Sequence, residues 1–280
     1  MRNNFNITVL SDNRKLDEML ESEHGLCVFL DTGKHKILLD TGASGLFIRN
    51  AGRLGIDIRE IDYVFISHGH ADHIGGLIYF LEVNSKAKIL LSEKALNQRF
   101  FSLRNGYRNI SFDSELGKSR ERCVFVEEEL HLDGYISIFS CHSTSFMKPI
   151  ANGTLFKDSR NGLELDDFNH ELVFCCGSED LFVYTGCAHK GLMNILDSVR
   201  KVKGKKPGIV LGGFHLLDSK PGQFFETELE ILQIGEYLRN MYSKTLFFTG
   251  HCTGIQSFEV LKKQFNKKIE SFYTGYIAQL

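Results

Sequence analysis

The sequence has few prolines and no long apolar segment. It contains 3 prolines against 26 glycines, a balance that indicates many tight turns built on glycine. Its longest apolar runs fall far short of the ~20 residues that a membrane-spanning helix needs. Internal repeats and low-complexity or Pro/Ser-rich linkers are also lacking. We therefore expect a single domain over residues 1–280 that does not contact a membrane.

An excess of one charge is lacking too. Lys and Arg number 33 and Asp and Glu number 35, which gives a formal net charge of -2. This balance excludes the strongly basic surface typical of nucleic-acid-binding proteins. We expect a small-molecule partner and no nucleic acid, and the sequence leaves the oligomeric state open.

The cysteine content bears on the cellular compartment. Seven cysteines are an odd number, and residues 1–10 lack the charged segment followed by an apolar one that begins a secretion signal. We therefore expect a cytoplasmic protein whose thiols are free or bound to metal.

Strand-like and helix-like patterns alternate along most of the chain. Strand patterns occur at residues 6–10, 26–30, 36–39, 63–66, 87–91, 135–139, 172–174, 181–184, 208–211 and 245–248, and helical spacing occurs at 43–54, 74–83, 191–202, 227–241 and 255–265. This α/β pattern predicts two sheets packed face to face beneath outer layers of helices. The pattern loosens after Gln98, so we expect an inserted loop or cap without sheet over about residues 97–130.

The strongest chemical signal is SHGHADHIGG at residues 67–76, where a predicted strand ends. Its four candidate ligands are His68, His70, Asp72 and His73. In an extended segment His68 and His70 project to the same side, whereas Asp72 and His73 follow on a tight turn and can address a neighbouring point. Imidazole and carboxylate suit Zn²⁺, Mn²⁺ or Fe²⁺. The motif predicts two adjacent divalent metal ions, with zinc expected before manganese or iron.

Three further motifs each end a predicted strand in a glycine-lined turn that carries a histidine. They are TGCAHKG at residues 185–191, GGFHL at 212–216 and TGHCTG at 249–254. In α/β folds such strand ends meet at one edge of a sheet, where sites commonly lie. We therefore expect His189, His215 and His251 to lie close together.

The HxHxDH element, with LLDTG at residues 38–42 before it, resembles the metallo-β-lactamase superfamily of metal-dependent hydrolases. The three turn motifs are similar to those of a branch of 7,8-dihydropterin-6-methyl-4-(β-D-ribofuranosyl)aminobenzene-5'-phosphate synthase-like proteins. The resemblance implies a four-layer αββα sandwich. It implies that the first metal is bound by His68 and His70, and the second by Asp72, His73 and His251. Asp40 would orient a ligand, with capping of its own turn as the alternative.

The chain departs from the superfamily pattern at Cys187, where many members have an aspartate that bridges both metals. On an extended turn Cys187 and His189 would face the same side, so that a thiolate and an imidazole could complete the first metal site. Packing of Cys187 in the core and a structural role for His189 stay open as alternatives.

The resemblance implies hydrolysis by a hydroxide that bridges two metals ~3.5–4 Å apart. Asp72 would fix the second metal and steer a proton, and His215 would stabilise charge on the substrate unless it is a structural histidine. The alternatives are a di-iron redox protein of the same fold and a non-catalytic, metal-stabilised ligand-binding protein.

Three further residues are candidate substrate contacts. Arg104 and Arg108 are interleaved with aromatic residues and would suit a small phosphorylated or pterin-like ligand, but a solvated loop is the alternative. His170 precedes a strand and is a candidate substrate contact or metal ligand, or an exposed loop residue.

Overall fold

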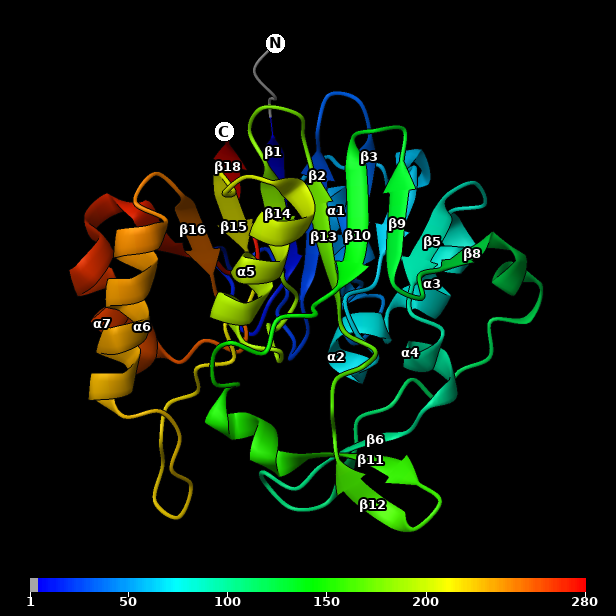
Figure 1. Cartoon of the computed structure of the whole chain (residues 1–280). Helices are drawn as coiled ribbons and strands as arrows, with labels where there is room; N and C mark the ends of the chain where they lie inside the picture. Colours follow the sequence, from blue (N-terminus) through cyan, green and yellow to red (C-terminus); the bar gives the residue numbers. More distant parts are fainter. Residues whose placement is uncertain (1–4) are drawn as a thin grey trace.

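The computed structural model describes residues 5–280, apart from the side chain of Asn266, and is built around two seven-stranded sheets (Figure 1). The first sheet has the spatial order β18 (Ile277–Gln279), β1 (Asn6–Ser11), β2 (Cys27–Asp31), β3 (Lys36–Leu39), β4 (Tyr63–Phe65), β5 (Lys88–Leu91) and β8 (Cys123–Phe125). The second has the order β17 (Ile269–Ser271), β16 (Leu246–Thr249), β15 (Ile209–Leu211), β14 (Phe182–Tyr184), β13 (Leu172–Cys176), β10 (Ile136–Ser140) and β9 (Glu129–Leu132).

Strand direction decides where the site lies. Strands β3, β4 and β5 are parallel in the first sheet, and strands β14, β15 and β16 are parallel in the second. Strands β2 and β3 form the antiparallel hairpin that the sequence predicts. Because parallel strands all end at the same edge, the loops that carry the predicted motifs are gathered there.

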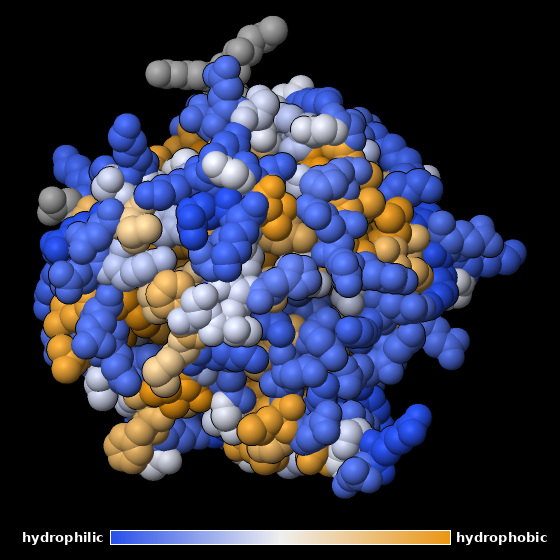
Figure 2. All heavy atoms as spheres, viewed as in Figure 1, coloured by the Kyte–Doolittle hydropathy of each residue, from blue (hydrophilic) through white to orange (hydrophobic). Residues whose placement is uncertain are grey.

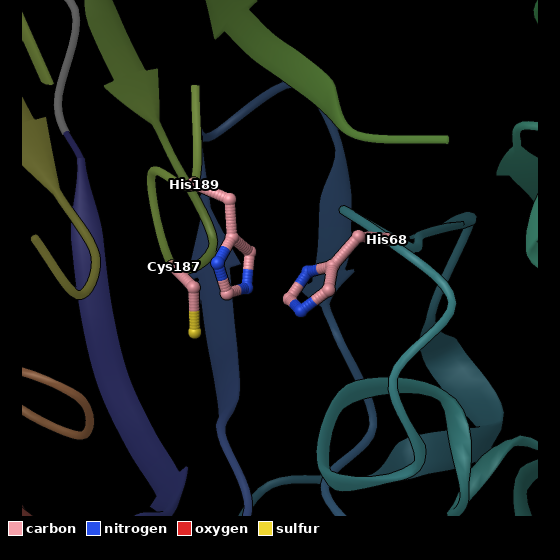
Figure 3. Close-up of side chains that lie close together, drawn as sticks. All are labelled: His68, Cys187 and His189. Atoms are coloured by element: carbon pink, nitrogen blue, oxygen red, sulfur yellow. The ribbon is translucent and has the colours of Figure 1, made fainter. Parts of the chain in front are cut away.

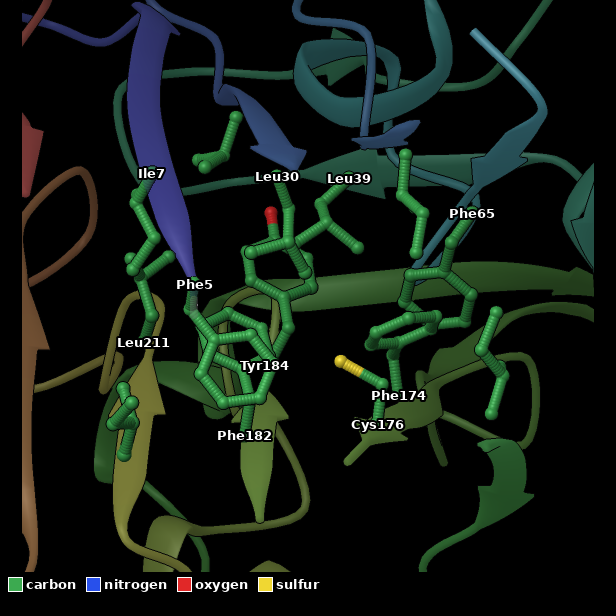
Figure 4. Close-up of a cluster of buried hydrophobic side chains, with 14 of the residues drawn as sticks. Phe5, Ile7, Leu30, Leu39, Phe65, Phe174, Cys176, Phe182, Tyr184 and Leu211 are labelled. Carbon is green, nitrogen blue, oxygen red and sulfur yellow. The ribbon is translucent and has the colours of Figure 1, made fainter. Parts of the chain in front are cut away.

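Each main sheet is buried on both faces. In β3, Leu39 belongs to the apolar cluster between the sheets, whereas Leu38 belongs to the cluster under the helices of the first sheet. Between the sheets the ring of Phe65 lies 5.4 Å from that of Phe174 and 6.2 Å from that of Tyr184 (Figure 4). Full burial of one such side chain contributes ~1.5–3 kcal/mol, so this cluster holds the two sheets together.

Helices cover both outer faces. The first sheet packs against α1 (Leu46–Arg53), α2 (Ala71–Ile74), α3 (Leu77–Val83) and α4 (Lys94–Asn97), and the second against α5 (Leu192–Lys203), α6 (Glu228–Met241) and α7 (Ile255–Phe265). Short 3-10 helices span Ile58–Glu60, Gly117–Arg122, Ile150–Thr154 and Asn266–Lys268. The predicted αββα sandwich is therefore confirmed.

The predicted helix over residues 74–83 is divided at Gly75 and Gly76. A Cβ atom on Gly76 would lie 2.0 Å from the backbone oxygen of Thr41, so only glycine permits the turn after β3 to pack this closely. This contact brings Asp40 and the HxHxDH turn together.

A third, four-stranded sheet covers the strand ends and corrects the prediction of a sheet-free insertion over residues 97–130. Strand β6 (Phe100–Ser102) pairs with β7 (Arg108–Asn109) and with β11 (Leu155–Ser159), which pairs with β12 (Gly162–Leu165). The later part of the predicted insertion instead supplies β8 and β9 to the main sheets. We call the small sheet and its connecting loops the cap. The sheet was missed because β6 and β7 are short and β6 pairs with the distant strand β11.

Hydrophilic residues occupy most of the face shown in Figure 2, interrupted by separate hydrophobic patches. Met147 and Phe224, each 79% exposed, are among the most exposed large apolar side chains. Over residues 5–280, the helices are too short or too polar to cross a bilayer. All seven cysteines have free thiols.

Candidate metal centre

The structure brings every predicted metal ligand to one edge of the sandwich. Asp40 follows β3, residues 68–73 follow β4, and the other candidates follow β14, β15 and β16. The predicted ligands gathered there are His68, His70, Asp72, His73, Cys187, His189 and His251.

The turns at this edge are strained. The backbone φ angle is 57° at Asp40, 58° at Ala188, 51° at His215 and 53° at His251. A residue with a Cβ atom in this left-handed region costs ~1 kcal/mol or more. Such strain, repeated at one edge, is typical of a functional site.

Three buried side chains form a first group: His68, Cys187 and His189, which point toward one another (Figure 3). One ligand atom of each lies within 4.8 Å of the other two. The Nε2 atoms of His68 and His189 are buried and have no hydrogen-bond partner. Burial lowers the pKa of both imidazoles, so the rings are neutral and each keeps a lone pair. Unpartnered lone pairs beside a thiol fit a divalent metal ion.

The hydrogen bonds behind these rings determine which nitrogen carries the proton. The Nδ1 atom of His68 faces the Oγ atom of Ser67 at 2.8 Å, and this hydroxyl donates to Asp40 at 2.7 Å. We therefore assign the proton of His68 to Nδ1, which leaves Nε2 unprotonated and facing the group.

A second group consists of His73, Cys187 and His251. The Nε2 atom of His73 lies 3.1 Å from the Cys187 sulfur and 3.1 Å from the Nε2 atom of His251. The nearest oxygen of Asp72 lies 3.4 Å from the Nε2 atom of His251. Burial alone would raise the pKa of Asp72, but the imidazoles of His73, His251 and His24 hold it well below its usual range. Cys187 thus belongs to both groups.

Asp40 supports both groups from behind. Its buried carboxylate accepts hydrogen bonds from the backbone N–H of Ser67 (2.6 Å), the Ser67 hydroxyl (2.7 Å) and the Tyr184 hydroxyl (2.7 Å). The same carboxylate lies 2.6 Å from the Nδ1 atom of His73. This geometry fits the orienting role expected for Asp40. The left-handed backbone at Asp40 fits the alternative, in which the residue stabilises its own turn.

His70 lies beside the first group but belongs to a third one, with Asp166 and His170. Its ring centre is 4.6 Å from that of His68 and 5.0 Å from that of His189. The structure therefore places Cys187, and not His70, among the ligand atoms nearest to His68 and His189.

The expectation for His170 needs correction. Its side chain is completely buried, so it is not an exposed loop residue. Its Nδ1 atom accepts a hydrogen bond from the backbone N–H of Gly69 at 3.0 Å, and its Nε2 atom lies 3.1 Å from Asp166. Both nitrogens therefore have partners within the protein.

The two candidate arginines have different surroundings. The Arg104 guanidinium lies 3.4 Å from the Nε2 atom of His215, and its Nε–H donates to the Thr154 hydroxyl at 3.3 Å. Burial lowers the pKa of Arg104, and no acidic side chain within residues 5–280 forms an ion pair with it. Arg108 is exposed on β7, where its backbone pairs with β6, and its side chain makes neither a hydrogen bond nor an ion pair with the described residues. The structure thus brings Arg104, and not Arg108, to the site.

His215 is buried against this arginine and the first group. Its ring centre is 4.2 Å from that of His189. Because a guanidinium only donates, we assign the proton of His215 to Nδ1, an atom that is buried without a hydrogen-bond partner.

Two residues near the second group have no signal in the sequence. The ring of His24 stacks on that of His251, with centres 5.3 Å apart, and its Nε2 atom lies 3.3 Å from Asp72. The side-chain oxygen of Asn13 lies 3.1 Å from the Nδ1 atoms of both His24 and His251. Neither residue stands in a recognisable motif.

Cys252 is a further residue that was not predicted. The sulfurs of Cys252 and Cys187 and one ring nitrogen of His215 all lie within 4.8 Å of one another. Its place in TGHCTG beside His251 was the available signal. The edge thus holds two thiols.

Comparison with known proteins finds similar sequences and structures in one superfamily. The model of the metallo-β-lactamase superfamily matches residues 22–136. The chain is 26% identical over 274 residues, 92% of its length and 90% of the relative's, to the 7,8-dihydropterin-6-methyl-4-(β-D-ribofuranosyl)-aminobenzene-5'-phosphate synthase of Methanocaldococcus jannaschii.

Solved structures show the same fold. Tm1679, described as a metal-dependent hydrolase of the β-lactamase superfamily, superposes with a TM-score of 0.79 at 29% identity, covering 99% of both chains. Unliganded yeast PDE1 superposes with a TM-score of 0.61 at 12% identity, covering 100% of both chains, which shows likeness of fold alone. These matches show that the chain has the metallo-β-lactamase fold and is similar to members of that superfamily over most of its length.

Proposed function

We propose that the protein is a binuclear metal-dependent hydrolase that acts on a small phosphorylated, pterin-like substrate. The observation that carries this proposal is the position of Cys187, which lies within 4.8 Å of ligand atoms from two separate histidine pairs. One pair is His68 and His189, and the other is His73 and His251. A sulfur shared in this way stands where many superfamily members have a bridging aspartate.

The donor set favours zinc. Thiolate and imidazole are ligands of borderline or soft cations, whereas Mg²⁺ and Ca²⁺ prefer oxygen. Two divalent ions bound here would supply a water of lowered pKa as the nucleophile and would polarise the group under attack. His70 and Asp72 complete the proposed ligand set beside the two pairs.

The chain's own residues would bind and orient the substrate. The half-buried Arg104 has no acidic partner among residues 5–280, so its guanidinium is available for a phosphate or another anion. His215 keeps Arg104 in place and holds its own Nδ1–H beside the first group, where it can donate to a substrate oxygen. Asp72, with a side chain 21% exposed, is the carboxylate that would move a proton.

The choice of substrate class has a second support. The synthase of Methanocaldococcus jannaschii is named for a product that contains a phosphate, a dihydropterin and an aminobenzene ring. A cap with Arg104 at the metal centre suits such a molecule, and the same site can perform C–O or P–O bond chemistry.

Metal analysis of protein purified without chelator, followed by assays on a phosphomonoester, a phosphodiester, a lactone and a thioester, tests the proposal. We expect two equivalents of metal per chain and turnover of a phosphorylated compound that is lost on chelation. Iron with visible absorbance would favour the redox alternative. Metal without any turnover would favour a binding protein.

A further inference from the structure

A buried carboxylate of the cap, Asp166, faces His70 in the loop of residues 67–76, which we call the metal loop. Asp166 follows β12, and its side chain is completely buried. One carboxylate oxygen accepts a hydrogen bond from the backbone N–H of Phe168 at 2.8 Å. The other oxygen faces two imidazoles, with the Nε2 atom of His170 at 3.1 Å and the Nε2 atom of His70 at 3.5 Å.

The protonation of His170 follows from its neighbours. Its Nδ1 atom accepts a hydrogen bond from the backbone N–H of Gly69, so Nδ1 is unprotonated and Nε2 carries the proton. His170 therefore donates to Asp166, and its two nitrogens are satisfied.

His70 is the remaining member of this group. Its Nε2 atom is buried and has no hydrogen-bond partner, and the carboxylate of Asp166 is 3.5 Å away. An unprotonated Nε2 atom at this place would turn its lone pair toward a negative charge, which is unfavourable in a buried site. The proton of His70 therefore belongs on Nε2, and Nδ1 keeps the lone pair. The ring centre of His70 is 4.6 Å from that of His68 and 5.0 Å from that of His189, and its Nε2 atom faces Asp166.

We propose that Asp166 is a positioning residue that holds His70 in the Nε2–H form, so that Nδ1 is the atom offered to the first metal. His170 accepts a hydrogen bond from the backbone of Gly69 and donates one to Asp166. Through these contacts the cap helps to hold the metal loop in place. This inference rests on the metal centre of the proposed function. Partners behind a metal-binding histidine typically account for ~10–100-fold in metal affinity.

The test compares Asp166→Asn with Asp167→Asn. Asp167 is the neighbouring cap residue, but its carboxylate pairs with Lys157 at 2.8 Å, away from His70. Zinc affinity is measured by competition with a chromophoric chelator. We expect Asp166→Asn to weaken the first zinc equivalent ~10–100-fold and to leave the second near its original affinity, whereas Asp167→Asn changes neither.

A second measurement uses the metal-free wild-type protein, so it does not require that a variant folds. Nitrogen-15 NMR of the wild-type imidazoles reports which nitrogen of His70 carries the proton, and we expect Nε2. A proton on Nδ1 would overturn the inference. If Asp166→Asn binds zinc as the wild type does while His70→Ala loses the first equivalent, the inference fails and the metal centre stands. If His70→Ala also keeps that equivalent, His70 is not a ligand and the inference fails, whereas the proposed metal centre stands on His68, Cys187 and His189.

Discussion

Asn152 is joined to His189 at two points: its side-chain N–H donates to the backbone oxygen of His189 at 2.7 Å, and its side-chain oxygen lies 3.1 Å from the ring Nδ1 atom. Asn13 repeats this arrangement on His251, at 2.8 and 3.1 Å. Each proposed metal group thus has one histidine whose ring and backbone are fixed by the same asparagine. Because the amide N–H is already used, the amide oxygen accepts from Nδ1–H and leaves Nε2 free for a metal.

Replacing either asparagine should weaken one metal selectively. Asn152→Ala removes the acceptor behind His189, so we expect the first zinc equivalent to bind ~10-fold or more weakly, and Asn13→Ala should do the same to the second. Chelator competition on both variants measures this. Equal affinities for wild type and both variants would show that the paired hydrogen bonds do not prepare the rings for metal.

Because Cys187 belongs to both metal groups, its replacement should affect metal content differently from the replacement of a histidine. His68→Ala and His189→Ala should each remove mainly the first metal, and His73→Ala and His251→Ala mainly the second. Cys187→Ser should lower the occupancy of both, because a serine hydroxyl poorly replaces a thiolate between two borderline cations. Elemental analysis of the purified variants checks this. Two full equivalents in Cys187→Ser would return Cys187 to a packing role.

Arg104 and Arg108 form a matched pair for the substrate site. Arg104→Met should raise KM for a phosphorylated substrate by ~10-fold or more, the equivalent of one charge-assisted hydrogen bond, whereas Arg108→Met should change it little. Steady-state kinetics with the phosphorylated compound and its dephosphorylated analogue separate the two effects. The same loss with both compounds would mean that Arg104 does not bind the phosphate.

The features that could be predicted from the sequence are those encoded by residues close together in the chain. The strand β4 and the ligand cluster after it lie within a dozen residues, so a short apolar run and the HxHxDH spacing were enough to predict both. Asn13, His24, Asn152 and Asp166 reach the site only through tertiary contacts, and nothing in the residues around them indicates it. The burial of His170 had no local signal either, because its two partners, Gly69 and Asp166, are brought to it by the fold.

The pH dependence of stability can be tested away from the metal centre. Hydrogen bonds from Lys201, Arg200 and Ser143 hold the pKa of Asp197 below its usual value, and its side chain is only 10% exposed. A folded-state pKa below the unfolded value of about 3.8 means that the unfolded chain binds the proton more tightly. This stabilisation is complete above that value and is lost as the pH falls below it.

Asp197→Asn should therefore lower the melting temperature at pH 7, and the gap from the wild type should narrow below pH ~4. Thermal unfolding of both proteins across this range measures the gap. A gap that stays constant at low pH would assign the effect to lost packing and not to charge.

The cap is built from two segments that lie far apart in the sequence, so the ribosome makes them at different times. Strand β11 begins at Leu155 and pairs with β6, which ends at Ser102, so 53 positions (155 − 102) separate them along the chain. At the ~5–20 residues per second of translation, β6 leaves the ribosome ~3–10 s before its partner strand. Those intervening residues build β8, β9 and β10, one strand of the first sheet and two of the second. The edge of β6 with its two phenylalanines therefore lacks its partner β11 in the nascent chain during this interval, and it is then open to pairing with a neighbouring chain.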